Sequence, residues 1–108
     1  MTGSVSFPEL WLCDFPFTSG ADTKRRPSLV LFDLGGDALI ARVTSVLHSE
    51  PFDYAMEDWQ AANLLKPSTV RINRIVTFEK SLLIRKLGEL SPVDAEAVRT
   101  IWNTQLRL

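Results

Sequence analysis

The chain has 108 residues, which suffice for one domain with a modest core but not for two. Hydrophobic residues make up 45% of the chain and charged residues 23%, as in an ordinary globular protein, and no apolar run is long enough to span a bilayer. A net charge of −1 argues against binding to nucleic acid through overall charge, so any such contact requires a local basic patch. We expect a single domain over residues 1–108.

The N-terminal half predicts three short strands. The run at 10–15 is apolar enough for a buried strand, and Cys13 within it is expected to be a buried, inert thiol. Pro27 fits the first residue of a strand, where proline is tolerated. In chain order we expect a strand at 10–15, a polar flexible loop at 18–26, a strand at 27–32, a hairpin turn with two glycines at 33–37 and a strand at 38–45.

The C-terminal half predicts further strands and two helices. At 68–73, Val70 and Ile72 alternate with polar residues, which is typical of a half-buried strand. Ser91 suits the N-cap of a helix and Pro92 its first turn. We expect a loop at 48–51, an extended piece at 52–56, a short helix at 59–62 that Asp58 caps and Asn63 stops, strands at 68–73 and 81–84, and a closing helix from 92 through 105. These elements indicate a small, mainly β barrel with added helices.

Cysteine usage and the first residues indicate the compartment. Cys13 is the single cysteine, so it can form no internal disulfide and has no second thiol beside it for a metal. The first twenty residues contain no Lys or Arg, and Glu9 and Asp14 interrupt their apolar stretch. They therefore do not resemble a signal peptide, and we expect a cytoplasmic protein.

Several kinds of site are disfavoured by the residues that are present. The chain has one histidine, no cysteine cluster and no acidic pair at metal-ligand spacing, so the sequence predicts no metal site and no cofactor. Gly35 and Gly36 lack the remainder of a phosphate-binding loop and are better explained by a turn. Composition alone leaves a Ser-His-Asp hydrolase open, although no nucleophile elbow is present.

Arginines accompanied by small polar side chains remain as candidate functional groups. Arg42 and Thr44 share a face of one predicted strand, and Arg71 and Asn73 share a face of another, because side chains alternate along a strand. A basic run, Lys24, Arg25 and Arg26, precedes Pro27. Such a set suits cleavage of RNA by its own 2′-hydroxyl, in which guanidinium groups stabilise the charge on the phosphoryl oxygens without a metal. A surface arginine run is more often only a solvated face.

Several motifs lie along nearly the whole chain, at 10–15, in the polar loop with 24–31, and at 41–45, 58–68, Val70-Arg71 and 79–88. Each motif is weak alone, and together they are specific. They resemble the MazF/PemK toxins of toxin–antitoxin systems, and the motifs of the second half resemble the PemK-like branch.

This resemblance implies an SH3-like small barrel with a C-terminal helix, as in the CcdB, MazF and PemK toxins. It implies a homodimeric endoribonuclease that cleaves single-stranded RNA such as mRNA, leaves a 2′,3′-cyclic phosphate and is inhibited by a protein antitoxin. The catalytic arginine of the family falls on Arg26 and its hydroxyl partner on Thr44. The residues expected to contact RNA are Lys24, Arg25, Ser45, Arg71 and Asn73.

The sequence also departs from the family pattern. Asn73 stands where PemK has an aspartate and cannot act as a carboxylate base, which favours substrate contact there. Pro8-Glu9 replaces the usual Gly-Asp or Gly-Glu, a change that we interpret as structural. Arg71 could instead pair with an acid such as Glu79. The lone His48 is left outside the catalytic set.

Two alternatives of other kinds remain. The first is a non-catalytic barrel that binds a protein target, as the CcdB toxins do, and the second is a degenerate member without turnover. CcdB activity depends on a Trp-Gly-Ile tail, whereas this chain ends at 105–108 with Gln-Leu-Arg-Leu, which favours the nuclease. The tryptophans are expected to be core or dimer-interface anchors; they are Trp11, Trp59 and Trp102.

Overall fold

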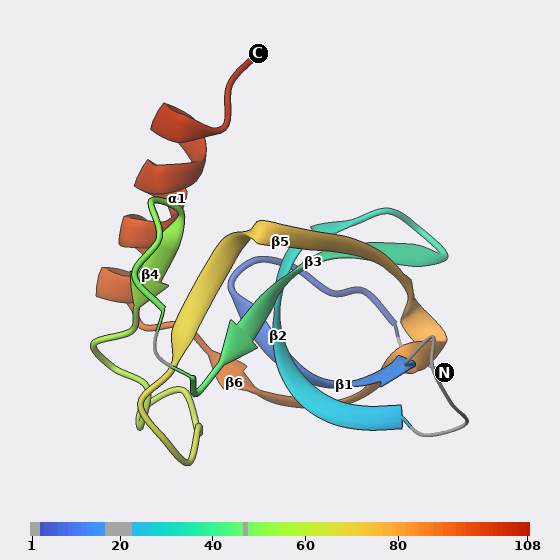
Figure 1. The fold of residues 1–108 in the computed structure, drawn as a ribbon. Coiled ribbons are helices and arrows are strands. Elements are labelled where there is room, and N and C mark those ends of the chain that lie inside the picture. The colour runs from blue at the N-terminus through green and yellow to red at the C-terminus, as the bar shows by residue number, and fades with distance from the viewer. Residues whose placement is uncertain (1–2, 17–22, 47) are drawn as a thin grey trace.

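A computed structural model of the chain describes residues 3–16, 23–46 and 48–108. All strand pairings are antiparallel, and the strands form one six-stranded sheet in the order β4-β5-β3-β2-β1-β6. The sheet curls into a small barrel with the helix beside it, which confirms the predicted fold class (Figure 1). The elements are β1 (Glu9–Pro16), β2 (Thr23–Asp33), β3 (Asp37–Thr44), β4 (Asp53–Ala55), β5 (Thr69–Glu79), the 3-10 helix η1 (Lys80–Leu82), β6 (Leu83–Glu89) and α1 (Pro92–Gln105).

β2 begins earlier than the sequence predicts. Residues 23–26, expected to be part of a loop, pair with β1, with Arg26 opposite Cys13 and Thr23 opposite Pro16. The loop prediction is therefore wrong for these residues, because pairing with an apolar neighbour strand outweighs their polar composition. Pro27 lies within the strand rather than at its start, and proline is tolerated there because β3 pairs with β2 only from Ser28 onward. The remainder of the predicted loop, 18–22, lies outside the described residues.

β5 is longer than predicted and bends. Ala41 of β3 faces Ile75, whereas the next residue, Arg42, faces Arg71, so residues 72–74 bulge out of the ladder. The expected strand at 81–84 is instead the helix η1 followed by β6.

The short helix predicted at 59–62 is absent from the structure, where these residues form a single turn. The amide of Leu64 donates to the carbonyl of Trp59 at 3.1 Å, and Asn63 adopts a left-handed conformation with φ of 65° that ends the turn. The Asn63 side-chain amide then donates to the carbonyl of Leu87 at 2.8 Å. Asn63 therefore stops the turn as expected and also ties it to β6.

α1 begins as the sequence predicts. The Ser91 hydroxyl accepts the amide of Asp94 at 3.2 Å, and Pro92 occupies the first turn. The fully buried Asp94 carboxylate accepts from the Tyr54 hydroxyl at 2.5 Å and from the amides of Glu57 and Asp58 at 3.0 and 2.9 Å. One carboxylate thus joins α1 to β4 and the segment after it.

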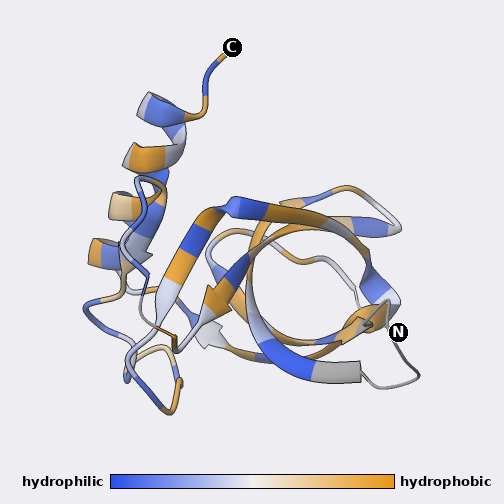
Figure 2. Ribbon diagram, viewed as in Figure 1, coloured by the Kyte–Doolittle hydropathy of each residue, from blue (hydrophilic) through white to orange (hydrophobic). Residues whose placement is uncertain are grey.

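Hydrophobic and hydrophilic residues are interspersed along the strands (Figure 2). The buried apolar residues form two clusters on opposite faces of the sheet, since neighbouring residues of β2 such as Leu29 and Val30 belong to different clusters. The cluster that contains Leu29 also includes residues of α1. Cys13 belongs to the second cluster and is fully buried, as predicted. Burial raises the pKa of the Cys13 thiol to about 11, with the hydroxyl of Ser28 acting in the opposite direction, so the thiol stays protonated at neutral pH.

Candidate functional site

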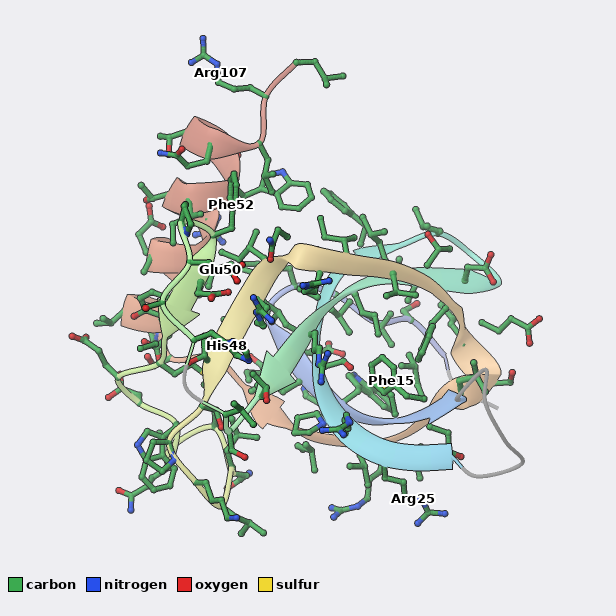
Figure 3. All side chains as sticks on the ribbon, in the orientation of Figure 1. Phe15, Arg25, His48, Glu50, Phe52 and Arg107 are labelled. Atoms are coloured by element: carbon green, nitrogen blue, oxygen red, sulfur yellow. The ribbon has the colours of Figure 1, made fainter. Side chains whose placement is uncertain are left out.

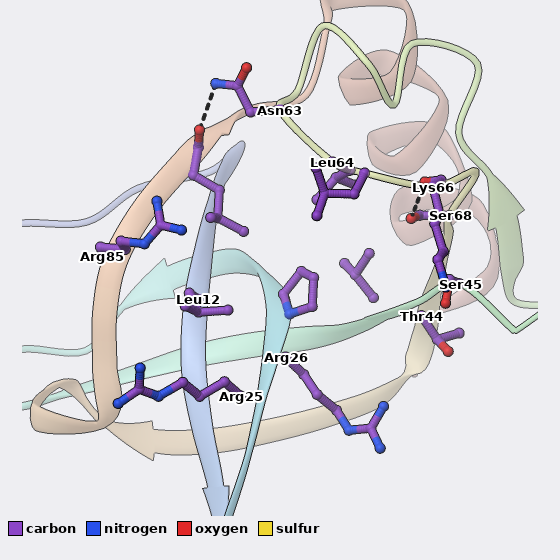
Figure 4. A pocket seen from close by; sticks show the side chains of 14 residues that line it. Leu12, Arg25, Arg26, Thr44, Ser45, Asn63, Leu64, Lys66, Ser68 and Arg85 are labelled. Carbon is purple, nitrogen blue, oxygen red and sulfur yellow. Dashed lines mark hydrogen bonds between the residues drawn. The ribbon is translucent and has the colours of Figure 1, made fainter.

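A hollow of about 550 Å³ opens where β2, the end of β3, residues 63–68 and β6 meet. Arg26 reaches it from β2 and Thr44 from β3, two neighbouring strands of the sheet (Figure 4). The structure therefore brings together the two residues that the sequence nominates for catalysis. The lining residues are Leu12, Arg25, Arg26, Pro27, Val43, Thr44, Ser45, Asn63, Leu64, Leu65, Lys66, Ser68, Arg85 and Leu87.

The side chain of Thr44 is held by a hydrogen bond from the following turn. Its side-chain oxygen accepts a hydrogen bond from the amide of Val46 at 3.1 Å, and among the described residues the Thr44 O–H donates to no acceptor. Thr44 is only 5% exposed, whereas the neighbouring Ser45 is exposed to solvent and lines the same hollow. A buried threonine that holds its hydroxyl toward a basic hollow is suited to donate to a phosphoryl oxygen.

The rim of the hollow is basic. Arg25 points away from the barrel, with its guanidinium 3.5 Å from the Asp14 carboxylate and its side chain 65% exposed (Figure 3). Lys66 and Arg85 add two cations that sequence reasoning missed, because they lie far from Arg26 in the sequence and only the fold places them around the same hollow. Lys24 lies in β2 opposite Phe15, and its side chain is outside the described part of the structure.

Arg71 forms ion pairs with two carboxylates. Its Nε donates to Asp53 at 3.0 Å and its Nη2 to Glu50 at 3.0 Å, and the Arg71 side chain is only 6% exposed. Arg71 therefore forms ion pairs, as the alternative interpretation of this residue expected, but its partners are Asp53 and Glu50 and the prediction of Glu79 is wrong. Burial alone would raise the pKa of Asp53, but the amide of Glu50 and the Arg71 guanidinium outweigh it, so the pKa lies below its ordinary value of 3.8.

Arg71 and Asn73 do not share a surface as the alternation predicts. The bulge at 72–74 separates them, so that Arg71 is buried while Asn73 is exposed. Asn73 instead lines a second hollow of about 430 Å³. Arg26 lines both hollows. Its lining residues are Phe15, Arg26, Ile40, Arg42, Asn73, Arg74, Ile75 and Val76.

Two further findings concern metals and membranes. Across residues 3–16, 23–46 and 48–108, no three His, Cys, Asp or Glu side chains gather as metal ligands would. In those same ranges, no helix has the length and the apolar character needed to cross a membrane.

Comparison with known proteins identifies relatives of this chain. A family model described as PemK-like, MazF-like toxin of type II toxin-antitoxin system matches residues 8–105. No curated protein matches the chain in sequence.

Known structures share the fold at low sequence identity. An endoribonuclease in complex with its cognate antitoxin from a mycobacterial species matches with a TM-score of 0.75 and 21% identity, over 95% of both chains. MazE–MazF from Deinococcus radiodurans matches with a TM-score of 0.76 and 20% identity, over 94% of this chain and 95% of that one. The Mycobacterium tuberculosis toxin MazF-mt6 matches with a TM-score of 0.72 and 19% identity, over 88% and 93%.

Proposed function

Because the chain belongs to the PemK-like, MazF-like toxins of type II toxin–antitoxin systems, we propose that it is an endoribonuclease that cleaves single-stranded RNA without a metal ion. One observation carries the proposal: Arg26 and Thr44 line one basic hollow, and among the described residues neither is paired with a carboxylate. The endoribonuclease structures that share the fold support the same reading.

The chemistry follows from these two side chains. The 2′-oxygen of the substrate attacks the adjacent phosphorus and loses its proton, and the bond from phosphorus to the 5′-oxygen breaks. The products are a 2′,3′-cyclic phosphate and a 5′-hydroxyl, which takes up a proton. Negative charge grows on the non-bridging oxygens during the attack, and the Arg26 guanidinium stabilises it through two parallel hydrogen bonds. The Thr44 hydroxyl donates a further hydrogen bond to the same group.

Residues at the rim contact the flanking RNA in this proposal. Lys24, Arg25 and Ser45 belong to the chain segments that border the first hollow, and Asn73 lines the second hollow together with Arg26. Arg71 acts differently: with both carboxylates bound to it, we propose that it holds β4 against β5 rather than contacting RNA.

The proposal is tested with a long single-stranded RNA whose cleavage sites are mapped by primer extension. Cleavage is expected to persist in excess EDTA, and an oligonucleotide with 2′-deoxyribose at the scissile position is expected to remain intact. Loss of cleavage on chelation with recovery in magnesium would contradict the mechanism. Absence of RNA cleavage by the folded protein would contradict the function and leave a barrel that binds a protein target.

We further propose a protein antitoxin that closes the same hollow of a homodimeric toxin. The mycobacterial relative is a complex with its cognate antitoxin, and the cations around Arg26 would attract carboxylates as well as phosphates. Labelled uncleavable RNA should therefore be displaced by the antitoxin in a fluorescence-anisotropy titration. Tight antitoxin binding that leaves RNA affinity unchanged would refute a shared site.

A further inference from the structure

Four arginines lie on one face of the barrel: Arg26 of β2, Arg42 of β3, and Arg71 and Arg74 of β5. Burial is the main cause that lowers the pKa of Arg42, and the positive charges of Arg26, Arg71 and Arg74 lower it further, so these three arginines lie within electrostatic reach of Arg42. The strand register sets Arg42 directly opposite Arg71. Like charges in such cross-strand positions repel one another.

Carboxylates neutralise only part of this cluster. Arg71 has Asp53 and Glu50, but in the described ranges Arg26, Arg42 and Arg74 make no ion pair. The Nε of Arg42 is also buried and has no hydrogen-bond partner in those ranges. A buried donor without a partner is unfavourable, and repulsion from neighbouring cations adds to that cost. An anion bound between these groups would remove both penalties.

The space for such an anion is present. The hollow of about 430 Å³ has Arg26, Arg42, Arg74 and Asn73 as its polar lining, and apolar side chains complete it. Phe15 contributes an aromatic ring inside the ring of strands, held against Phe78 with centroids 4.8 Å apart (Figure 3). Cations beside aromatic and aliphatic side chains suit a nucleotide, because the cations bind its phosphate and bases stack on aromatic rings.

We propose that this second hollow binds the RNA phosphodiester next to the scissile one, with Arg42 and Arg74 as its ligands and Phe15 against the adjoining nucleoside. The inference rests on the proposed function, since Arg26 lines both hollows and would stand between the two phosphates. Successive phosphates in RNA are joined through a single ribose. An RNA whose scissile phosphate meets Arg26 therefore places its next phosphate about one nucleotide from Arg26, and the second hollow begins at that same arginine.

The test measures binding of an oligonucleotide that spans a mapped cleavage site and carries 2′-O-methyl at the scissile nucleotide. Arg42→Gln and Arg74→Gln are each expected to weaken its affinity about tenfold and to lower the slope of log affinity against log salt by about 0.7. Arg107→Gln is the matched control, because it removes the same charge from an exposed residue near the C-terminus (Figure 3). It should change neither quantity.

Neutral methylphosphonate substitutions locate the contact. Replacing the phosphate beside the scissile one should weaken binding to the wild-type protein about tenfold. The same replacement should have little further effect on Arg42→Gln, because the contact is already lost. Thermal unfolding at low salt checks that the variants fold, and Arg74→Gln, at an exposed position, provides the test if Arg42→Gln does not.

Each other outcome has a distinct meaning. If wild type cleaves RNA while both variants bind RNA with unchanged affinity and salt slope, the second subsite is refuted and the proposed function stands. If wild type neither binds nor cleaves RNA, the proposed function fails and the subsite fails with it. If the variants bind RNA normally but weaken binding of an acidic peptide, the anion is a protein carboxylate and the RNA assignment is wrong.

Discussion

Arg71→Met should destabilise the protein strongly, although Arg71 lies at a strand position that the sequence nominated for RNA contact. The substitution keeps an unbranched apolar side chain but leaves the Asp53 carboxylate, whose side chain is 1% exposed, without its cation. The amide of Glu50, which donates to Asp53 at 3.0 Å, would be its remaining partner in the described part of the chain. Breaking one side of a buried ion pair costs about 3–5 kcal/mol.

The lower end of that range applies here. Glu50, the second carboxylate bound to Arg71, is 56% exposed, so water screens that part of the interaction while the Asp53 pair stays buried. We expect a loss of about 3 kcal/mol in the free energy of unfolding. For a domain of this size, that loss lowers Tm by on the order of 12 °C. Asp53→Asn should cost about 1–2 kcal/mol, because the amide oxygen still accepts a hydrogen bond and Glu50 still faces Arg71.

Urea unfolding followed by tryptophan fluorescence measures these differences. Arg85→Met is a matched control for the arginine change, since Arg85 is exposed on β6 and should stay within about 0.5 kcal/mol of wild type. The Asp53 pKa is depressed in the folded state, so its contribution is present above 3.8 and is lost as the pH falls through the folded pKa. The gap between wild type and Arg71→Met should therefore shrink in acid. If Arg71→Met keeps the stability of wild type but loses RNA cleavage, the structural role of Arg71 is refuted and the expected contact between Arg71 and RNA is supported instead.

Three further substitutions probe the site and the fold. Arg26→Ala should reduce single-turnover cleavage on the order of 100-fold or more and Arg26→Lys less, since a planar guanidinium binds two oxygens at once; equal rates for wild type and Arg26→Ala would exclude it from catalysis. Asp94→Asn should cost about 2–3 kcal/mol in urea unfolding, because an amide nitrogen must then face one of three donors; an unchanged midpoint would contradict its role as a junction. Gly88→Ala should destabilise by about 1–3 kcal/mol, because its Cβ would lie 2.7 Å from the Ala62 carbonyl oxygen; wild-type stability would show that the turn at 59–63 yields easily.

Local signals explain what could be predicted from the sequence. The N-cap at Ser91 and the glycine turn before β3 depend on a few adjacent residues, and Gly35 indeed has φ of 94°. The strand at 23–26 was missed because its polar residues are typical of a loop, and only the ladder to β1 makes them a strand. The turn at 59–63 was mistaken for a helix because a cap and a stop signal do not specify length.

Long-range pairing limits what could be predicted about the site. Arg26 and Thr44 were found through motif and strand context, and the structure places them in one hollow. Asp53 as the partner of Arg71 depends on the β4–β5 register, which the chain order does not reveal. Arg74 reaches the second hollow because of the bulge in β5, a break that no local pattern announces.

The most direct test of the central claim is the chemistry of the new RNA ends formed in EDTA. Mass spectrometry of a short synthetic RNA after cleavage reads both ends at once. Attack by the substrate's 2′-hydroxyl, stabilised by Arg26 and Thr44, predicts a 2′,3′-cyclic phosphate on one fragment and a 5′-hydroxyl on the other. Fragments that carry a 3′-hydroxyl and a 5′-phosphate would show that water attacks instead, and would contradict the account.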